Sequence, residues 1–498
     1  MDALIDLSPA APCPQKFNLA AYVLSAARKT PHKIALTVYE AGIARRYSYA
    51  QMAQAVFGAA TGLRQAGIRA GDRVMLRIGN TVDFPVCFLA LAALDAIAMP
   101  CSIALTDREV KVLVGKTMPK AMICEPEFGL PGFDGLILDS QEVQKFQNLS
   151  PARPILGDPN RPGYIIFTSG TSGQPRAVLH AHRAVWARRM MWDGWYNLTP
   201  DDVMMHAGAL NWTYTLGTGL MDPWAIGASA VIPNTQDPAD LWRIMRAEEA
   251  SIFAAAPGIY RRLLQQHFKC PPSLRHGLSA GDVLPHSVRD SWQDRTQTPI
   301  CEAFGMTECS TFLSARPSAS AHLAVQPGRK IAIFDGDDLA RFGQVGTISV
   351  DGQDPGLMLG YIENAAITLP LRNGWYHTAD QGQMYADGRI DFAGRSGDIL
   401  NAGGYRVAPR EIEHLLEACP GVIEVGVTEV EVRRDVFVIA ALVVVAPLCD
   451  LTEIDALVAR DLARYKQPRI VKQVPALPRN VNGKLIRAAL PQLWKSQL

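Results

Sequence analysis

Short apolar runs rich in β-branched residues alternate along most of the chain with longer stretches in which apolar residues recur every three or four positions. The short runs predict strands at residues 73–79, 121–125, 164–167, 229–233 and 251–256. The periodic stretches predict helices, for example at residues 49–66 and 238–250. This alternation predicts an α/β fold with layers of helices around largely parallel sheets.

The most apolar stretch of the chain covers residues 84–99 and is interrupted by Asp95. It is too short and too interrupted to span a bilayer, so we interpret it as a buried helix. The first 15 residues contain two acidic and no basic side chains, which does not fit a secretory signal. We therefore expect no transmembrane segment.

The last hundred residues follow a different pattern. Pro409 opens a helical stretch, and Gly421 lies just beyond its end. The elements predicted after it are strands at 422–430 and 436–445, a helix at 452–465 and a strand at 469–474. We place the boundary in the glycine-containing turn at 395–398, between a large N-terminal domain, residues 1–395, and a small α+β domain, residues 396–498.

The amino-acid composition narrows the classes of function that we expect for this chain. The chain has 498 residues, 48% of them hydrophobic and 19% charged, and a formal net charge of +1. This balance gives no reason to expect nucleic acid as the main partner. The nine cysteines form no Cys-x-x-Cys pair and no zinc-like cluster, which is typical of reduced thiols in a cytoplasmic protein. The sequence leaves a homodimer open.

A loop dense in small and hydroxyl residues follows the predicted strand at 164–167. It reads FTSGTSGQPR over residues 167–176. Its hydroxyl groups can donate hydrogen bonds, its glycines allow the backbone to approach an anion, and Arg176 adds positive charge. The loop lacks the Walker pattern. Taken alone, it fits an ordinary turn as well as a polyphosphate site.

This loop and four later motifs together resemble the signatures of the adenylate-forming superfamily, which contains acyl- and aryl-CoA synthetases, luciferases and peptide-synthetase adenylation domains. The later motifs are FGMTE (304–308), GWYHTAD (374–380), GRSGDILNAGGYRVAPREIE (394–413) and PRNVNGKLIR (478–487). They follow the family's order over residues 18–490, and an ordered set is more specific than any single motif. The resemblance implies a mobile C-terminal domain.

The resemblance also implies a role for individual residues. Thr307 would bind near the α-phosphate, Glu308 would hold Mg²⁺, and Asp380 would accept hydrogen bonds from the ribose. Lys484 would bridge the acid and the α-phosphate. The other residues implied to contact ATP or AMP are Thr168, Ser169, Gly170, Thr171, Ser172, Gly173, Arg176, Ala280, Gly281, Asp282, Phe304, Gly305, Met306, Arg395 and Arg406.

The reaction implied by the resemblance has two steps. A carboxylate displaces pyrophosphate from MgATP to give an acyl-AMP, and a thiol then displaces AMP. Coenzyme A is the expected thiol, passing a loop at Gly403, Gly404 and Tyr405. Two alternatives remain open: an enzyme that loads a separate carrier protein, and a catalytically weak nucleotide-binding homologue.

The acid pocket is expected to come from residues 206–228, with His206, Trp212 and Tyr214 as candidate contacts and Gly305 and Met306 as a facing wall. The amino-acid sequence of this region resembles most that of medium-chain acyl-CoA and benzoate-type ligases. Its apolar and aromatic residues suit a hydrophobic acid. We expect a medium-sized aliphatic or aromatic monocarboxylate.

Three of the motifs depart from the family's pattern. The signature loop has Arg176–Ala177 where the family usually has Lys-Gly, and Ala379 replaces a glycine. At the hinge, Gly397 precedes Asp398, and we predict Gly397 as the pivot because glycine absorbs large backbone changes.

The pivot can be tested by Gly397→Pro. Proline fixes φ, so this variant should retain acyl-AMP formation and lose most thioester formation. The two half-reactions are measured separately, as pyrophosphate release and as acyl-CoA formed from supplied acyl-AMP. An equal loss of both would show that Gly397 is not the pivot.

Overall fold

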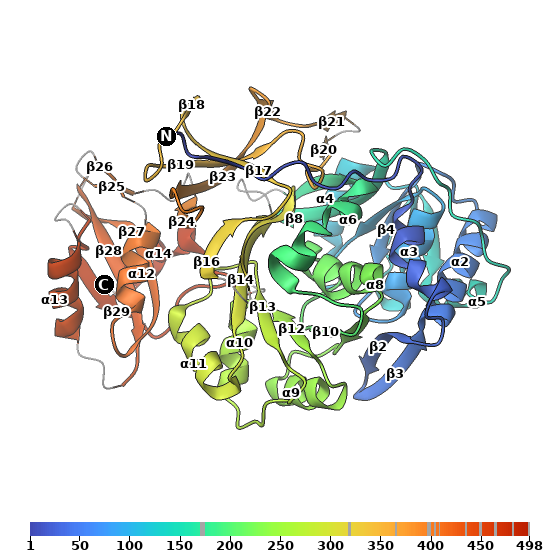
Figure 1. Ribbon diagram of the computed structural model, residues 1–498, viewed down its shortest axis with the longest axis horizontal. Coiled ribbons are helices and arrows are strands. Elements are labelled where there is room, and N and C mark those ends of the chain that lie inside the picture. The colour runs from blue at the N-terminus through green and yellow to red at the C-terminus, as the bar shows by residue number, and fades with distance from the viewer. Residues whose placement is uncertain are drawn as a thin grey trace.

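The computed structural model describes most of the chain (Figure 1). The described residues are 1–169, 175–316, 320–363, 366–395, 400–402, 405–407, 409–433, 436–447, 451–462, 466–480 and 483–496. A large N-terminal part carries three sheets, and a small C-terminal part lies beside it at one end of the molecule. The α/β fold class and this large-and-small organisation are confirmed.

The first large sheet has nine strands. Its order is β16 (Ser320–Val325), β15 (Ser310–Arg316), β14 (Ile300–Met306), β13 (His276–Ser279), β12 (Ile252–Ala255), β10 (Val203–His206), β11 (Ser229–Ile232), β2 (Ile34–Glu40) and β3 (Ile43–Ser48). Pairing is parallel from β14 through to β2 and antiparallel at both edges. The strands predicted at 229–233 and 251–256 are confirmed as β11 and β12.

The second sheet has eight strands. Its order is β21 (Ala366–Thr368), β20 (Gly360–Glu363), β9 (Pro175–Ala181), β8 (Pro162–Ser169), β5 (Ile97–Pro100), β4 (Arg73–Arg77), β6 (Ala121–Cys124) and β7 (Leu136–Asp139). The antiparallel pair β8–β9 enters and leaves the hydroxyl-rich loop. The predicted strand before that loop is therefore confirmed.

The helix predicted at 84–99 is wrong in its second half. Helix α3 (Asp83–Ala93) ends at Ala93. Asp95 has a φ of 63°, and the chain then continues as the strand β5. The Asp95 carboxylate accepts a hydrogen bond from Arg161 at 2.6 Å and lies 3.1 Å from His182 Nε2, which fixes the turn. Helix and strand are both buried on all sides, so their apolar pattern does not separate them.

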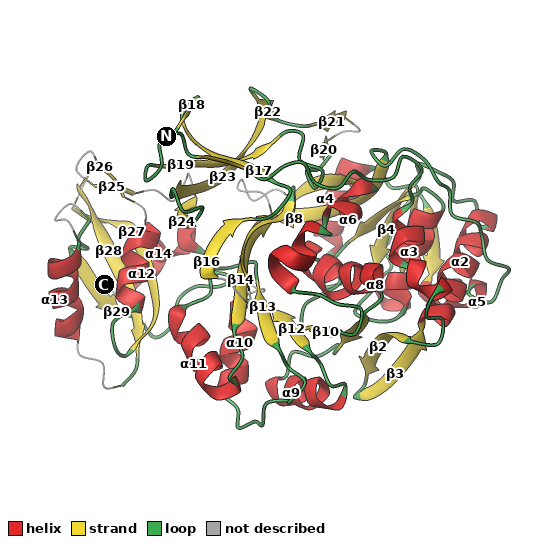
Figure 2. Cartoon of the chain, viewed as in Figure 1, coloured by secondary structure: helices red, strands yellow, loops and turns green. Residues whose placement is uncertain are grey.

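The third sheet and the C-terminal part complete the fold (Figure 2). The third sheet has the path β1 (Leu4–Asp6), β17 (Lys330–Asp335), β19 (Val345–Asp351), β23 (Trp375–Met384) and β22 (Leu371–Arg372), with β18 (Asp338–Leu339) and β24 (Ile390–Arg395) beside it. The C-terminal part contains β27 (Val422–Arg433), β28 (Val436–Val445), β29 (Ile470–Gln473), α12 (Pro409–Glu417), α13 (Leu451–Asp461) and α14 (Leu490–Ser496). Each element predicted there is present, and α13 is shorter than expected.

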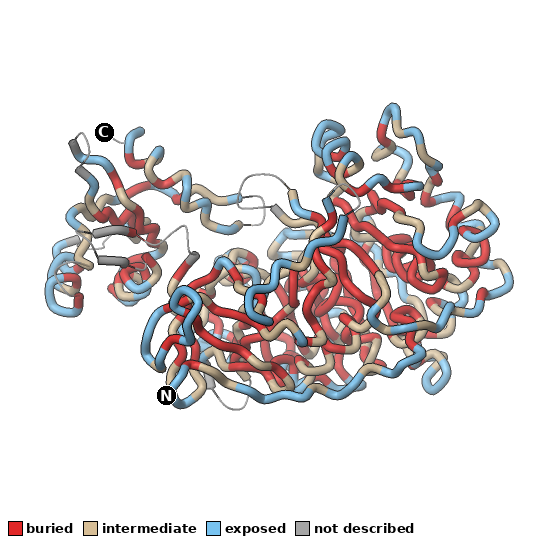
Figure 3. Tube along the Cα trace, turned by 90° about the horizontal axis from the view of Figure 1, so that it is seen from above, coloured by how far each residue is buried: buried red, intermediate tan, exposed pale blue. Residues whose placement is uncertain are grey.

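The C-terminal part has apolar cores of its own. One groups Ile412 and Leu416 of α12 with Val427 of β27, and another groups Leu490 and Trp494 of α14 with the other face of the sheet. Figure 3 shows these buried segments separated from those of the large part. Separate cores are typical of separate domains. Of the predicted boundary turn, residues 395–398, only Arg395 at the end of β24 is described, so the boundary stays a prediction.

The helices of the large part pack on the two big sheets, as α2 (Tyr49–Gln65) and α3 do around the largest apolar core. The helices predicted at 49–66 and 238–250 are confirmed as α2 and α9 (Pro238–Ala247). Among the described residues, no helix combines the length and the hydropathy needed to cross a bilayer.

Substitution of Gly58 in α2, with Gly115 as a control, tests how closely α2 packs on α5 (Ser140–Phe146). A Cβ at Gly58 would lie 2.3 Å from the carbonyl oxygen of Gln147, while a Cβ at Gly115 in α4 (Asp107–Thr117) meets nothing within 4 Å. Gly58→Ala should destabilise the protein by about 1–3 kcal/mol through overpacking. Gly115→Ala should stabilise it by about 0.4–1 kcal/mol. Urea unfolding measures both, and equal effects would contradict the packing described.

Candidate active site

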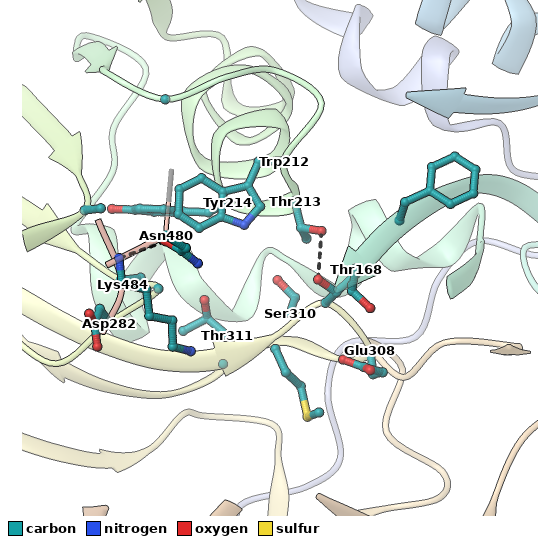
Figure 4. A pocket seen from close by; sticks show the side chains of 18 of the residues that line it. Thr168, Trp212, Thr213, Tyr214, Asp282, Glu308, Ser310, Thr311, Asn480 and Lys484 are labelled. Atoms are coloured by element: carbon teal, nitrogen blue, oxygen red, sulfur yellow. Dashed lines mark hydrogen bonds between the residues drawn. The ribbon is translucent and has the colours of Figure 1, made fainter. Parts of the chain in front are cut away.

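A cavity of about 1650 Å³ lies where the parallel strands of the nine-stranded sheet end. Residues that directly follow β10, β12, β13 and β14 line it, because the carboxyl ends of parallel strands meet at one edge of a sheet. The C-terminal loop around Lys484 reaches the same cavity (Figure 4). The two domains thus share one site.

The turn between β14 and β15 carries Thr307 and Glu308. A Cβ at Gly305 would lie 2.4 Å from the carbonyl oxygen of Ser310, so the hairpin needs glycine there to close this tightly. The tight turn points Thr307 into the cavity, where its hydroxyl lies 3.5 Å from that of Thr213. Both predicted residues of the turn line the cavity.

Glu308 is mostly buried, and one carboxylate oxygen accepts a 2.8 Å hydrogen bond from the Tyr361 hydroxyl. Tyr361 is in turn 2.9 Å from the Tyr376 hydroxyl. No group of three or more His, Cys, Asp or Glu able to hold a metal is found among the described residues. One fixed carboxylate in the lining of the cavity fits Mg²⁺, which takes one or two carboxylates and completes its shell with phosphate oxygens and water.

The two ends of the hydroxyl-rich loop at residues 167–176 also contribute to the cavity. Thr168 at the end of β8 and Arg176 at the start of β9 both line the cavity. The Arg176 guanidinium lies 5.2 Å from the centre of the Tyr361 ring, next to the Glu308 hydrogen bond. Ser169 ends β8. Gly170, Thr171, Ser172 and Gly173 lie outside the described residues.

The predicted ribose and adenine residues also face the cavity. Asp380 in β23 is buried, and its backbone N–H donates to the Thr378 hydroxyl at 3.1 Å. Ala280, Gly281 and Asp282 follow β13, and the backbone of Gly281 has a φ of 94°. A Cβ at Gly281 would lie 3.0 Å from the Trp212 ring, so this loop packs against the start of helix α7 (Thr213–Leu216).

Lys484 reaches the cavity through charged contacts between the domains. Arg261 of α10 (Pro257–Leu264) pairs with Glu424 of β27. Arg479, in the lysine motif, pairs with Glu424 at 2.8 Å and lies 3.9 Å from Asp282. The Lys484 backbone N–H donates to Asn480 Oδ1 at 2.9 Å, and its side chain is exposed to the cavity. These contacts hold the lysine loop over the nucleotide-side residues.

For several predicted site residues the structure describes only the backbone. Arg395 lies in β24, where it pairs in register with Asp380, and Tyr405 and Arg406 lie in the short strand β26 (Tyr405–Val407). Their side chains are outside the described part of the chain. So are the hinge candidates Gly397 and Asp398 and the predicted coenzyme A residues Gly403 and Gly404.

Trp212 and Tyr214 line the cavity together with Gly305 and Met306. We call this part of the cavity the acid side, and its binding of the acid stays a prediction. Trp212 precedes and Tyr214 lies in α7 (Thr213–Leu216), and the Tyr214 hydroxyl donates to the Leu278 carbonyl at 2.9 Å.

Two predicted contacts differ from expectation. His206 is fully buried and does not line this cavity, because it ends β10 beneath Gly208 and Gly219. Burial lowers its pKa to about 3, so it is neutral. Phe304 faces a neighbouring cavity and packs 5.1 Å from the Phe392 ring, because alternate residues of a strand face opposite sides.

The sequence did not predict the ion pair that is buried at the floor of the acid side. Arg188 and Asp222 are 4% and 1% exposed and pair at 2.7 Å. Burial acts to lower the pKa of Arg188, but the Asp222 carboxylate outweighs it and raises that pKa, so the guanidinium stays charged. The one sign of this ion pair in the sequence is the aspartate Asp222 within the apolar stretch at residues 214–228.

A cavity lined by the Thr168 hydroxyl, the Arg176 guanidinium, the Glu308 carboxylate and a lysine supplied by a second domain is typical of an enzyme that activates a carboxylate with a nucleotide. The sequence profile of the AMP-binding enzyme family matches residues 23–362, and that of the AMP-binding enzyme C-terminal domain matches residues 411–484. The chain therefore belongs to this family, the adenylate-forming superfamily that includes acid–CoA ligases.

Individual relatives agree with that membership. The human protein "Acyl-coenzyme A synthetase ACSM3, mitochondrial" is 26% identical, covering 97% of this chain and 91% of the relative. The "Benzoate--CoA ligase" of Thauera aromatica is 27% identical, covering 97% of each. The fold is similar to that of an anthranilate CoA ligase, AuaEII, crystallised with anthranoyl-AMP, with a TM-score of 0.86, 22% identity and coverage of 98% and 99% of the two chains.

Two histidines at the interface predict that the docking of the small domain on the large domain depends on pH. His286, which starts α11 (His286–Thr296), and His414 of α12 face each other with 3.0 Å between their Nε2 atoms. Burial lowers both pKa values, that of His414 to about 4, and the charged groups around the pair are Arg289, Asp290, Asp391, Arg410 and Glu417. Domain docking should therefore be strongest above about pH 6.5, the free histidine value, and weaken as pH falls toward 4.

Fluorescence energy transfer between labels on the two domains, followed from pH 7.5 to 5, measures this effect. The double variant His286→Gln/His414→Gln should lose the pH response. A response of the same size in the variant would assign the titration to other groups.

Proposed function

We propose that this protein is an ATP-dependent carboxylic acid–CoA ligase. It joins a carboxylate to AMP with release of pyrophosphate and then transfers the acyl group to the thiol of coenzyme A, releasing AMP. The observation that carries the proposal is that Lys484 of the small domain lines one cavity with Thr307, Glu308 and Asp380 of the large domain.

The first half-reaction follows from charge placement. Lys484 lines the cavity, and its ammonium would stabilise the negative charge that builds up as the carboxylate oxygen attacks the α-phosphorus. Thr168, Thr307 and Arg176 surround the same space and would hold phosphate oxygens. Mg²⁺ held at Glu308 would neutralise phosphate charge. Most of the rate acceleration would come from positioning and electrostatics.

The second half-reaction requires Lys484 to leave and coenzyme A to enter. Two features of the described residues support a moving small domain: it has its own cores, and charged pairs rather than a continuous core join it to the large domain. The names of the relatives support coenzyme A as the acceptor.

For the acid, we propose a medium-sized aliphatic or aromatic monocarboxylate. Trp212, Tyr214 and Met306 give the acid side flat apolar walls that suit an acyl chain or an aromatic ring. The relatives act, by name, on acyl groups and on benzoate.

Lys484→Ala separates the two steps. Loss of the ammonium should reduce acid-dependent pyrophosphate release by at least about 10²-fold, as expected for removing a charge-stabilising group. Thioester formation from supplied acyl-AMP should remain within a few-fold of wild type. The matched control is Lys495→Ala in α14, an exposed lysine away from the cavity, which should change neither rate.

These assays also bear on the proposal as a whole. They use ATP, Mg²⁺, coenzyme A and a panel of aliphatic, aromatic and amino acids, with AMP and pyrophosphate followed together. Turnover of amino acids alone, or adenylation without transfer to coenzyme A, would contradict the acid–CoA ligase assignment.

A further inference from the structure

The floor of the acid side is a hydrogen-bonded polar cluster, although Trp212, Tyr214 and Met306 beside it are largely apolar. The cluster consists of Arg188, just after α6 (Arg183–Ala187), Tyr196, Thr218, Asp222 and Ser310. Arg188, Thr218 and Ser310 line the cavity, and Tyr196 and Asp222 lie behind them. Figure 4 shows the Ser310 hydroxyl directed into the cavity beside Thr213.

The pair at the centre of the cluster is electrically balanced. Arg188 Nε donates to Asp222 at 2.9 Å, and Nη2 donates to the other carboxylate oxygen at 2.7 Å. The Tyr196 hydroxyl donates to the same oxygen at 2.8 Å. A two-point contact of this kind neutralises the guanidinium charge. The floor therefore presents dipoles rather than a net charge.

The hydroxyls that face the cavity still have hydrogen-bonding capacity. Arg188 Nη1 donates to Ser310 Oγ, so Ser310 is the acceptor in that bond. No acceptor for the Ser310 proton is found among the described residues. The Tyr196 hydroxyl donates to Asp222, so Thr218, 2.9 Å away, is the donor to the Tyr196 oxygen. Thr218 Oγ1 also accepts from Arg188 Nη2 at 3.3 Å, and because a hydroxyl oxygen has two lone pairs it can accept one more hydrogen bond. One donor and one acceptor thus face the acid.

The backbone at Ser310 points to the same use. Ser310 has a φ of 61°, in the left-handed region where non-glycine residues are uncommon. Glycine would adopt this conformation at lower cost. Such strain persists where the surroundings over-determine it, and it gathers at binding and catalytic sites. Here the charge-assisted bond from Arg188 holds the serine hydroxyl at the cavity wall.

We propose that the acid carries an uncharged hydroxyl group that accepts from Ser310 and donates to Thr218, with Arg188 and Asp222 as positioning residues behind them. This inference rests on the acid–CoA ligase function and narrows its substrate class to hydroxylated monocarboxylates. A hydrocarbon at this place would leave the Ser310 proton unpaired. A second carboxylate would approach Asp222 and find no counter-charge that is not already paired.

The test compares matched acids in the pyrophosphate-release assay. The sets are benzoate, 3- and 4-hydroxybenzoate and terephthalate, and hexanoate, 6-hydroxyhexanoate and adipate. At least one hydroxylated acid should exceed its plain and dicarboxylate partners in kcat/KM by about ten- to a hundredfold, because a site built to bond a hydroxyl rejects the analogue that lacks it. A plain acid or a dicarboxylate with the highest kcat/KM would overturn the inference.

Three variants locate the preference. Thr218→Val and Ser310→Gly remove the hydroxyls, and glycine keeps the positive φ; each should bring the hydroxylated-to-plain ratio to within a few-fold of one. The matched control is Thr215→Val, three residues away, since Thr215 is fully buried and its hydroxyl has no partner among the described residues. The control should keep the ratio, and an unchanged ratio in Thr218→Val would contradict the inference.

The outcome remains informative if no acid supports turnover, a result that would contradict the proposed function. Calorimetric titration of the same acid pairs into the full-length protein measures their affinities without catalysis. Tighter binding of the hydroxylated partner, lost in Thr218→Val, would support the inference. Equal binding of each pair would overturn it.

Discussion

The position of Lys484 depends on a small set of charged contacts between the two domains. Glu424 of the small domain accepts from Arg261 of the large domain and from Arg479 of its own lysine motif, and Arg479 also faces Asp282. These groups are partly exposed, so water and salt weaken their attraction. Contacts of this strength can hold the lysine loop over the cavity and still release it, which a continuous apolar interface would oppose.

The large domain, in contrast, fixes its share of the site through backbone geometry. Strand ends at one edge of the nine-stranded sheet place the adenine-side loop, the Thr307–Glu308 turn and the acid-side helix around one cavity. Gly305 lets the β14–β15 hairpin close, and Tyr361 holds Glu308 from the neighbouring sheet. A rigid half and a movable half together explain how one cavity serves two successive reactions in the proposed function.

Much of this arrangement was predictable from local sequence. Strands such as β4, β6, β11 and β12 were recognised because their apolar runs are short and bounded by turns, and the motif residues Thr307, Glu308, Asp380 and Lys484 were predicted as a set and do line one cavity.

The misses have three different physical causes, and the first is that burial removes the alternation of apolar and polar residues from which elements are predicted. The segment 84–100 is apolar except for Asp95, so the pattern of apolar residues did not show that α3 and β5 are separate elements. His206 was expected in the acid pocket because the period of a strand does not say which face the ligand occupies. Arg188 and Asp222 are 34 residues apart, and only the fold brings them together.

The central claim is that a carboxylate oxygen of the acid attacks the α-phosphorus of ATP in this cavity. Incubating the protein with ATP, Mg²⁺, coenzyme A and an accepted acid labelled with ¹⁸O in its carboxylate tests that claim directly. The account predicts AMP that carries one ¹⁸O atom, because the bond formed in the first step stays with AMP when the thiol attacks the carbonyl carbon. Unlabelled AMP, or ¹⁸O found in inorganic phosphate instead, would contradict it.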